Sequence, residues 1–288
     1  MGIIIGVKNL KMNKTYNDDC TIITKDFDDE SIDLILTDPP YQIGYIDMIA
    51  QQSYKNRGLD KEVKPIKNDS KNTIDWDLFF SESYRILKPK KMLYMCCRLD
   101  MIINIAEFIE RSKFKYAHDF VWQKGDMGYG NLNIMGTTHE LIVGLSKGNP
   151  EKCRQIYVDG ELKKRTPAIY IGKLRESEYY GHPTQKPVGM MSYIILNRTD
   201  EGDLVLDTFA GVGSTTVAAK LLSRNYIAIE LDKEHYDRME HRLVNGEHLL
   251  MYKEMLKRGL HSRNGGVTYD LDNYKVRSKD QYDFVGYR

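Results

Sequence analysis

The chain has 288 residues, of which 41% are hydrophobic and 29% charged, and its formal net charge is +1. This composition can form the core of one large domain with an inserted lobe, and the charge gives no overall basic signature of a nucleic-acid binder. No apolar run reaches the roughly 18 residues of a membrane span, and residues 2–7 are too short for a signal-peptide core. We therefore expect a soluble, cytoplasmic protein.

The chain has four cysteines, Cys20, Cys96, Cys97 and Cys153. They show neither a Cys-x-x-Cys spacing nor a nearby histidine pattern typical of zinc sites, so we expect reduced, mostly structural thiols and no metal site. The chain also lacks a Pro-Cys pair whose thiolate could attack a ring carbon, which argues against methylation of cytosine at C5.

Near the amino terminus, the informative stretch is the apolar run 32–37, which stops at Asp38-Pro39-Pro40-Tyr41. Before it, residues 1–31 show little pattern beyond Asp19-Cys20 and a candidate strand over 21–24. Because proline cannot continue a β-ladder and restricts the residue before it, the pattern predicts a strand that ends in a rigid turn. Ligands of open α/β sheets bind at the carboxyl ends of the strands, so Asp38 is expected at a ligand site.

The Asp38-Pro39-Pro40-Tyr41 turn has the groups needed to recognise an amine on a planar heterocycle. The carboxylate and a carbonyl of the stiff turn can each accept a hydrogen bond, and the tyrosine offers a flat face for stacking. The alternative is a capping aspartate before an ordinary Pro-Pro turn. The tetrapeptide resembles a motif of the DNA amino-methyltransferases, which methylate adenine N6 or cytosine N4.

Residues 42–71 are polar and lysine-rich and are expected to form a long loop, either a lid over bound substrate or a disordered insertion. Beyond it, strands and helices alternate, and Asp75 is a candidate helix cap. This alternation predicts an α/β fold with a largely parallel sheet. The expected elements are a helix over 76–87, a strand over 92–97, a helix over 99–112 and a strand near 120–122.

The alternation breaks over residues 123–181, which are rich in Gly, Asn, Lys and Tyr and are expected to form an inserted lobe rather than more of the sheet. Only 141–145 and 168–171 have strand-like patterns. From Lys147 to Arg175 there are eight basic and three acidic residues, and Lys163, Lys164 and Arg165 are consecutive. This excess is compatible with DNA contacts and equally with a solvated charged loop.

The alternation resumes after residue 182, and the polar tail 245–288 shows no assignable fold or role. The expected elements are a helix over 188–196, strand 204–206, helix 214–222, strand 226–230 and a helix over 234–243 capped by Asp232. Strand 204–206 leads into Asp207-Thr208-Phe209-Ala210-Gly211-Val212-Gly213-Ser214-Thr215, a tight Gly-x-Gly turn and helix start. The glycines permit close approach of a ligand, and the amides at a helix start favour an anionic group.

The acidic residue that ends the next strand, Glu230, is placed to hold ribose hydroxyls. The chain has no Gly-Lys-Ser/Thr sequence, and the loop lacks the third glycine of the dinucleotide fingerprint. The ligand implied has a ribose and a carboxylate but no pyrophosphate, and S-adenosylmethionine fits this description.

Three motifs in order, Asp38-Pro-Pro-Tyr41, His182-Pro-Thr-Gln-Lys-Pro187 and Phe209-Ala-Gly-Val-Gly213, closely resemble the β class of DNA amino-methyltransferases over residues 18–243. Read alone, His182 would be a surface residue. The resemblance implies a Rossmann-like S-adenosylmethionine-dependent methyltransferase fold with a catalytic half in 1–122, a target-recognition region in 123–181, a cofactor-binding half in 182–244 and an extension in 245–288. It implies cofactor contacts by Asp19, Cys20, Thr184, Gln185, Lys186, Asp207, Phe209, Ala210, Gly211, Gly213, Ser214, Thr215 and Glu230.

The resemblance also implies the reaction. The target base in duplex DNA is flipped out and stacks on Tyr41, while Asp38 and the Pro39 carbonyl accept from its amine and direct the nitrogen at the methyl group. Asp at position 38 favours adenine N6, with cytosine N4 as the alternative. Rivals are a catalytically inactive DNA-binding module and an RNA or protein-glutamine methyltransferase. Dimers occur in this class, but no interface pattern is visible, and neither a recognition sequence nor a partner endonuclease can be inferred.

Overall fold

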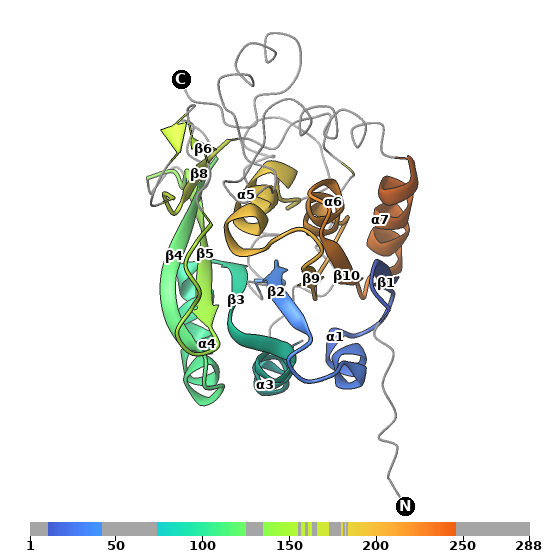
Figure 1. Cartoon of the computed structure of the whole chain (residues 1–288), viewed down its shortest axis with the longest axis horizontal. Helices are drawn as coiled ribbons and strands as arrows, with labels where there is room; N and C mark the ends of the chain where they lie inside the picture. The colour runs from blue at the N-terminus through green and yellow to red at the C-terminus, as the bar shows by residue number, and fades with distance from the viewer. Residues whose placement is uncertain are drawn as a thin grey trace, which may run out of the picture.

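An eight-stranded mixed sheet forms the centre of the molecule, with helices on both faces (Figure 1). This computed structural model describes residues 11–41, 74–124, 135–154, 157–158, 161–162, 166–172, 180, 182 and 184–245. The strand order is β1-β10-β9-β2-β3-β5-β4-β8. The strands are β1 (Lys14–Tyr16), β2 (Ile32–Thr37), β3 (Leu87–Cys97), β4 (Lys115–Gln123), β5 (His139–Ser146), β8 (Ile169–Ile171), β9 (Leu204–Asp207) and β10 (Asn225–Ile229).

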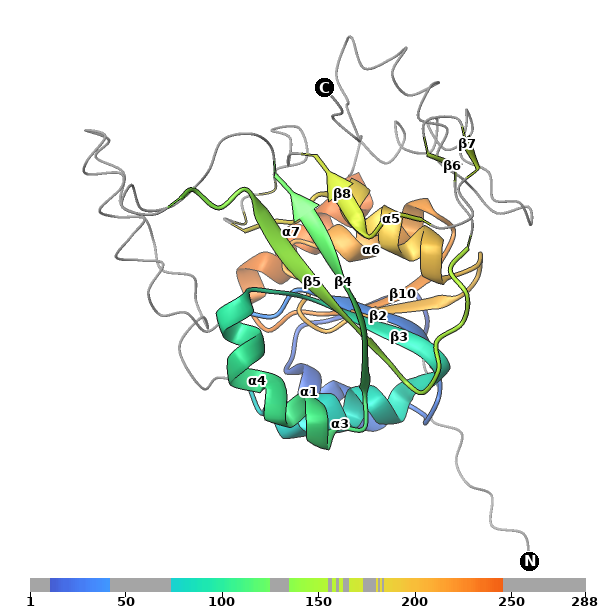
Figure 2. The ribbon, with the colours of Figure 1, turned by 90° about the vertical axis from the view of Figure 1, so that its left-hand side faces the viewer.

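The helices form two layers. Figure 2 shows α1, α3 and α4 below the sheet and α5, α6 and α7 above it. The helices are α1 (Cys20–Ile23), followed by a 3-10 turn (Thr24–Asp26), α3 (Trp76–Ile86), α4 (Leu99–Arg111), α5 (Val188–Arg198), α6 (Ser214–Leu221) and α7 (Lys233–Asn245). Among the described residues, no helix is long and apolar enough to cross a membrane.

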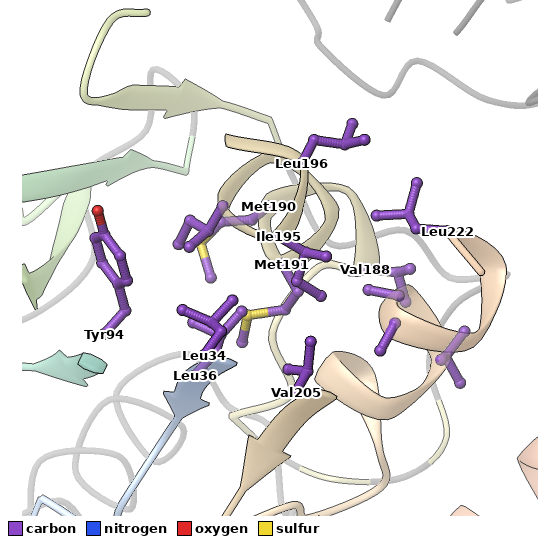
Figure 3. Close-up of a cluster of buried hydrophobic side chains, with 14 of the residues drawn as sticks. Leu34, Leu36, Tyr94, Val188, Met190, Met191, Ile195, Leu196, Val205 and Leu222 are labelled. Atoms are coloured by element: carbon purple, nitrogen blue, oxygen red, sulfur yellow. The ribbon is translucent and has the colours of Figure 1, made fainter. Parts of the chain in front are cut away.

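The all-buried strand β2 contributes to two hydrophobic cores, one on each face of the sheet. Because successive side chains of a strand point to opposite faces, Leu34 and Leu36 join the core beneath α5 and α6, whereas Ile35 joins the core with α3 and α4. Figure 3 shows Leu34 and Leu36 beside Met191 of α5. Such burial on both faces is typical of a strand covered by helices on each side.

The predicted alternation of strands and helices is confirmed, and so are both helix caps. The carboxylate of Asp75 accepts from the backbone N–H of Leu78 at 3.0 Å. Asp232 accepts from the N–H groups of Glu234 and His235 at 2.9 and 3.1 Å. These bonds satisfy N–H groups that have no partner within the helix, which is why the two aspartates mark the helix starts.

Two expectations about the first half of the chain are wrong, and one strand was not predicted. Residues 21–24 do not form a strand but belong to α1 and the 3-10 turn, because Asp19 caps the helix by accepting from the Thr21 N–H at 2.7 Å. Strand β1, only three residues long, has too short a pattern to be predicted. Strand β3 begins at Leu87 rather than at 92, and its register with β2 shifts around Lys90, which has a φ of 67°.

The expectation that residues 123–181 form a lobe outside the sheet is also wrong in part. Strand β5 lies between β3 and β4 and pairs antiparallel with both, and β8 extends the sheet as a parallel neighbour of β4. The sheet is therefore mixed rather than largely parallel on this side. Strands β6 (Tyr157–Val158) and β7 (Glu161–Leu162) form a separate two-stranded antiparallel sheet within the described residues. The loop predicted over 42–71 and the tail beyond Asn245 lie outside the described residues.

Candidate active site

The carboxyl ends of β2, β9 and β10 form one edge of the sheet, and a cavity of about 470 Å³ lies there. Strand β9 lies between β2 and β10 and pairs parallel with each of them, so Asp38, Asp207 and Glu230 follow three adjacent parallel strands or end them. This is the edge at which open α/β sheets bind ligands. The motif residues, far apart in the sequence, therefore meet at one place.

The cavity brings together nearly all predicted site residues. All four residues of the Asp38–Tyr41 turn line it. From the predicted cofactor set, the lining includes Asp19, Cys20, Thr184, Gln185, Lys186, Asp207, Phe209, Ala210, Gly211, Ser214, Thr215 and Glu230. Gly213 is not part of the lining, and Lys163, Lys164 and Arg165 lie outside the described residues.

The turn after β2 is tied to the loop after β9 by the hydroxyl of Thr37. This hydroxyl donates to Asp207 Oδ1 at 2.8 Å and accepts from the Phe209 N–H at 3.1 Å. Burial raises the pKa of Asp207 to about 7, opposed by its hydrogen bonds. The connection fixes the loop that bears Phe209 relative to the turn that bears Asp38.

Glu230 holds the Gly-rich loop from the other side. Its carboxylate accepts from the N–H of Gly211 at 2.6 Å and from the N–H of Asp232 at 2.8 Å. Burial raises the pKa of Glu230. Gly211 has a φ of 54°, a backbone conformation that glycine adopts without strain. The carboxylate therefore orders the loop and stays at the cavity surface with further acceptor capacity, because each of its oxygens has a second lone pair.

Gly213 packs closely against α7. Its φ is 79°, and a Cβ placed on it would lie 2.7 Å from Met239 Cγ on α7. We predict that Gly213→Ala lowers the free energy of unfolding by about 2–4 kcal/mol, from the strained φ and the overlap together. Gly202→Ala is the matched control, because Gly202 has a φ of 83° but open space around it. In denaturant titrations, the free energy of unfolding should decrease much less in the control than in Gly213→Ala. An equal decrease in both variants would contradict the packing role.

The carboxylate of Asp38 lies in a network of buried charges. Lys186 Nζ donates to Asp38 Oδ2 at 2.6 Å and lies 3.4 Å from Glu140 Oε2 on β5. The Tyr41 hydroxyl is 3.2 Å from both Asp38 Oδ1 and Glu140 Oε2. Lys124, at the end of β4, pairs with the other oxygen of Glu140. Two carboxylates thus face two ammonium groups, a balanced arrangement that can remain charged in a buried site.

The pKa values in this network follow from burial and from these pairings. Burial favours a neutral Lys186, but Asp38 and Glu140 outweigh it and raise the pKa of the ammonium. Burial also disfavours ionised Glu140, yet Lys186 and Lys124 hold its pKa below the ordinary value. For Asp38, burial raises the pKa, with Lys186 opposing and Glu140 adding to the rise. Asp38 is thus a stronger proton acceptor than an ordinary aspartate.

Sequence reasoning missed Glu140 and misjudged His182. Glu140 precedes an apolar strand run and carries no motif that would single it out. His182 lies at the cavity instead of at the surface, with its ring 4.4 Å from the ring of His235. Burial lowers the pKa of His182 to about 3, and the neighbouring His235, Lys186 and Arg238 add to this decrease. Its Nδ1 accepts from the Thr184 N–H at 3.3 Å, as a neutral imidazole can.

We predict that His182 makes the fold acid-sensitive. Since its folded pKa of about 3 lies below that of an unfolded histidine, the unfolded chain binds more protons between these values, and stability falls as the pH decreases. Between pH 6.5 and 4 this loss should reach about 3 kcal/mol. The free energy of unfolding, measured at both pH values, should decrease less in His182→Gln than in the wild type. His241→Gln changes an exposed histidine and should show the same decrease as the wild type. An unchanged loss in His182→Gln would refute the assignment.

Comparisons with known proteins agree with this geometry. The chain is 30% identical over 248 residues to the type II methyltransferase M2.DpnII of Streptococcus pneumoniae, covering 78% of this chain and 87% of that protein. It is 29% identical to the DNA adenine methyltransferase YhdJ of Escherichia coli, with 72% and 74% covered. The crystal structure of the M1.HpyAVI-SAM complex, at 24% identity, superposes with a TM-score of 0.57 over 80% of this chain and 98% of that one. A family model described as DNA methylase, of the N6/N4 methyltransferase type, matches residues 32–241, and the chain therefore belongs to this family.

Proposed function

We propose that this protein is an S-adenosylmethionine-dependent DNA methyltransferase that methylates the exocyclic N6 of adenine in duplex DNA. One observation carries the proposal: Asp38 and Tyr41 face the same cavity as the Gly-rich loop and Glu230. A carboxylate that can accept from an amine and a ring that can stack on a base therefore line the same cavity as the residues proposed to hold the cofactor. The family match and the similarity to an adenine methyltransferase support the same reaction.

The cavity has the donor and acceptor groups that S-adenosylmethionine requires. Glu230 ends the strand next to the Gly-rich loop, where an acidic side chain can accept from ribose hydroxyls. The loop after β9 approaches the cavity with small residues, Ala210 and Gly211, and Phe209 offers an aromatic surface. Asp19 and Cys20 line the same cavity. The bound cofactor supplies the activated methyl group.

The residues of the turn after β2 are proposed to hold the target amine. A carboxylate has about four acceptor sites, and Asp38 uses one for Tyr41 and one for Lys186, so it can also accept from the amine. The Pro39 carbonyl is the second proposed acceptor, and the Tyr41 ring is the stacking surface. Positioning and electrostatics then provide the catalysis. No covalent enzyme intermediate is needed.

The base is proposed to be flipped out of the duplex, since its amine is otherwise inaccessible to an enclosed site. Lys163, Lys164 and Arg165 are proposed to contact phosphates, which would make binding weaker as the salt concentration rises. Residues 123–181 remain our proposal for the target-recognition region, 1–122 for the catalytic half and 182–244 for the cofactor-binding half. A partner restriction endonuclease is proposed on the similarity to a protein described as a type II methyltransferase.

Transfer of a labelled methyl group from S-adenosylmethionine to unmethylated duplex DNA tests the proposal, with RNA of the same sequence and bulk protein as competing acceptors. We expect label in the DNA alone and a decline of the rate with added salt. Label in the RNA or protein would contradict the proposed substrate. Cofactor binding without transfer to any acceptor would instead support a catalytically inactive DNA-binding module.

A further inference from the structure

Glu140 lies at the beginning of β5, in the region that the sequence predicted to be outside the sheet. The ladder fixes its position: Glu140 is opposite Trp122 of β4, and the next residue, Leu141, is opposite Cys97 at the end of β3. Glu140 therefore lies just past the carboxyl end of β3, the neighbour of β2. Its side chain is 15% exposed. It does not line the cavity, and its contacts with the site are made through other side chains.

Both oxygens of Glu140 are engaged with residues around the site. Oε2 accepts from the Tyr41 hydroxyl at 3.2 Å and lies 3.4 Å from Lys186 Nζ, and Oε1 pairs with Lys124. Tyr41 and Lys186 also donate to Asp38. Glu140 and Asp38 thus share the single hydroxyl proton of Tyr41 and the ammonium group of Lys186. Glu140 is therefore a second carboxylate that interacts with the same two groups as Asp38.

The shared ammonium decides how well Asp38 accepts another hydrogen bond. Lys186 is 3% exposed, so water screens its charge very little. If Asp38 were its sole carboxylate partner, the ammonium of Lys186 would polarise the Asp38 carboxylate more strongly and would stay hydrogen-bonded to it. A second carboxylate at 3.4 Å divides the attraction. Glu140 therefore leaves Asp38 with more negative charge for an incoming amine.

We propose that Glu140 is a positioning residue for methyl transfer, which shares Lys186 with Asp38 and anchors the Tyr41 hydroxyl so that Asp38 remains a strong acceptor for the target amine. The inference rests on the proposed function and adds to it a residue from β5, within the proposed target-recognition region. It requires no contact between Glu140 and the base or the cofactor.

The charge balance gives the proposal a pH signature. Among the described residues, the titratable or charged groups that interact with Asp38 include Lys186 before α5, Glu140 on β5, Tyr41 after β2, Asp207 on β9, and Cys96 and Cys97 on β3. Removing the negative charge of Glu140 lowers the pKa of Asp38, because an opposing like charge is lost. The acid limb of the rate profile, where Asp38 becomes protonated, should then move to lower pH.

The test compares Glu140→Gln with the wild type in single-turnover methylation across pH, with cofactor affinity measured by calorimetry. We expect the maximal rate to fall about 10- to 100-fold, the range typical of a lost supporting contact. Cofactor affinity should stay unchanged and the acid limb should shift downward. Asp119→Asn is the matched control, a carboxylate on β4 that also accepts from a tyrosine hydroxyl, that of Tyr116, and should alter neither quantity.

Lys124→Met should shift the pKa of Asp38 in the direction opposite to Glu140→Gln. It also tests the proposal if Glu140→Gln does not fold. Lys124 is 29% exposed and balances Glu140 from outside the site. Its loss strengthens the effect of Glu140 on Asp38 and should move the acid limb to higher pH. If the wild type is active and the pH–rate profiles of the folded variants are not shifted, the role of Glu140 is overturned but the proposed function is not. A wild type that methylates no DNA would overturn the proposed function as well.

Discussion

Asp38→Ala is expected to reduce methyl transfer by about 1,000-fold or more, the cost of removing a preorganised electrostatic group. The change removes the proposed acceptor for the target amine, and the adjacent prolines leave the turn itself in place. Lys186 also loses its closest carboxylate, at 2.6 Å, but keeps Glu140 at 3.4 Å. The site should therefore remain folded while the amine is no longer aligned or polarised.

Two measurements make this result specific. Calorimetric affinity for S-adenosylmethionine should change little in Asp38→Ala, because Glu230 and the Gly-rich loop are untouched. Asp28→Ala, which removes an exposed aspartate before β2, should retain the wild-type rate. A substantial rate in Asp38→Ala would mean that another group binds the amine, and loss of cofactor affinity would mean that Asp38 acts through the cofactor site.

Lys186→Met is expected to damage both the fold and the reaction. The methionine is unbranched, one atom shorter and uncharged, and it leaves Asp38 and Glu140 facing each other without a shared cation. Breaking a buried pair in this way costs about 3–5 kcal/mol of stability. The geometry of Asp38 and Tyr41 is lost as well. The methylation rate of Lys186→Met should therefore decrease about as much as that of Asp38→Ala, and much more than that of a surface variant. Thermal unfolding and single-turnover rates measure the two effects.

The stability lost in the Lys186→Met variant should also depend on pH. Lys124 still pairs with Glu140 in this variant, but Asp38 has lost its cation and faces a like charge, so the pKa of Asp38 rises further. The folded variant then binds more protons than the unfolded chain just above the ordinary carboxyl pKa. Its stability deficit should therefore be smaller at pH 5 than at pH 8. Lys220→Met is the control, because Lys220 donates to the backbone oxygen of Leu243 and is exposed. A deficit that does not depend on pH would contradict the charge-balance account.

The features that the sequence could predict are local. The strand over 32–37 stops at prolines, and Asp75 and Asp232 begin helices through bonds to residues two or three positions ahead. The three motifs each have a recognisable local form, and their meeting at one sheet edge follows from the rule for parallel strands. The predicted strand at 21–24 failed because the cap formed by Asp19 outweighed the β-branched residues.

The features that the sequence could not predict depend on contacts between distant residues. The bond between Tyr41 and Glu140 spans 99 positions, and that between Lys186 and Asp38 spans 148. Arg242 reads as a charged residue on an amphipathic helix, yet it is fully buried and donates to the carbonyl of Val212 in the Gly-rich loop. Likewise, β5 could not be placed in the main sheet, because a short apolar run does not reveal its partner strand.

Nucleoside mass spectrometry of unmethylated duplex DNA, incubated with the purified protein and S-adenosylmethionine, tests the central claim most directly. We expect N6-methyladenine in the wild-type digest and none in the Asp38→Ala digest. N4-methylcytosine in place of N6-methyladenine would preserve the amine-acceptor mechanism but contradict the proposed base. A digest with neither product, from protein that binds the cofactor, would contradict the assignment of this cavity as a DNA-methylating site.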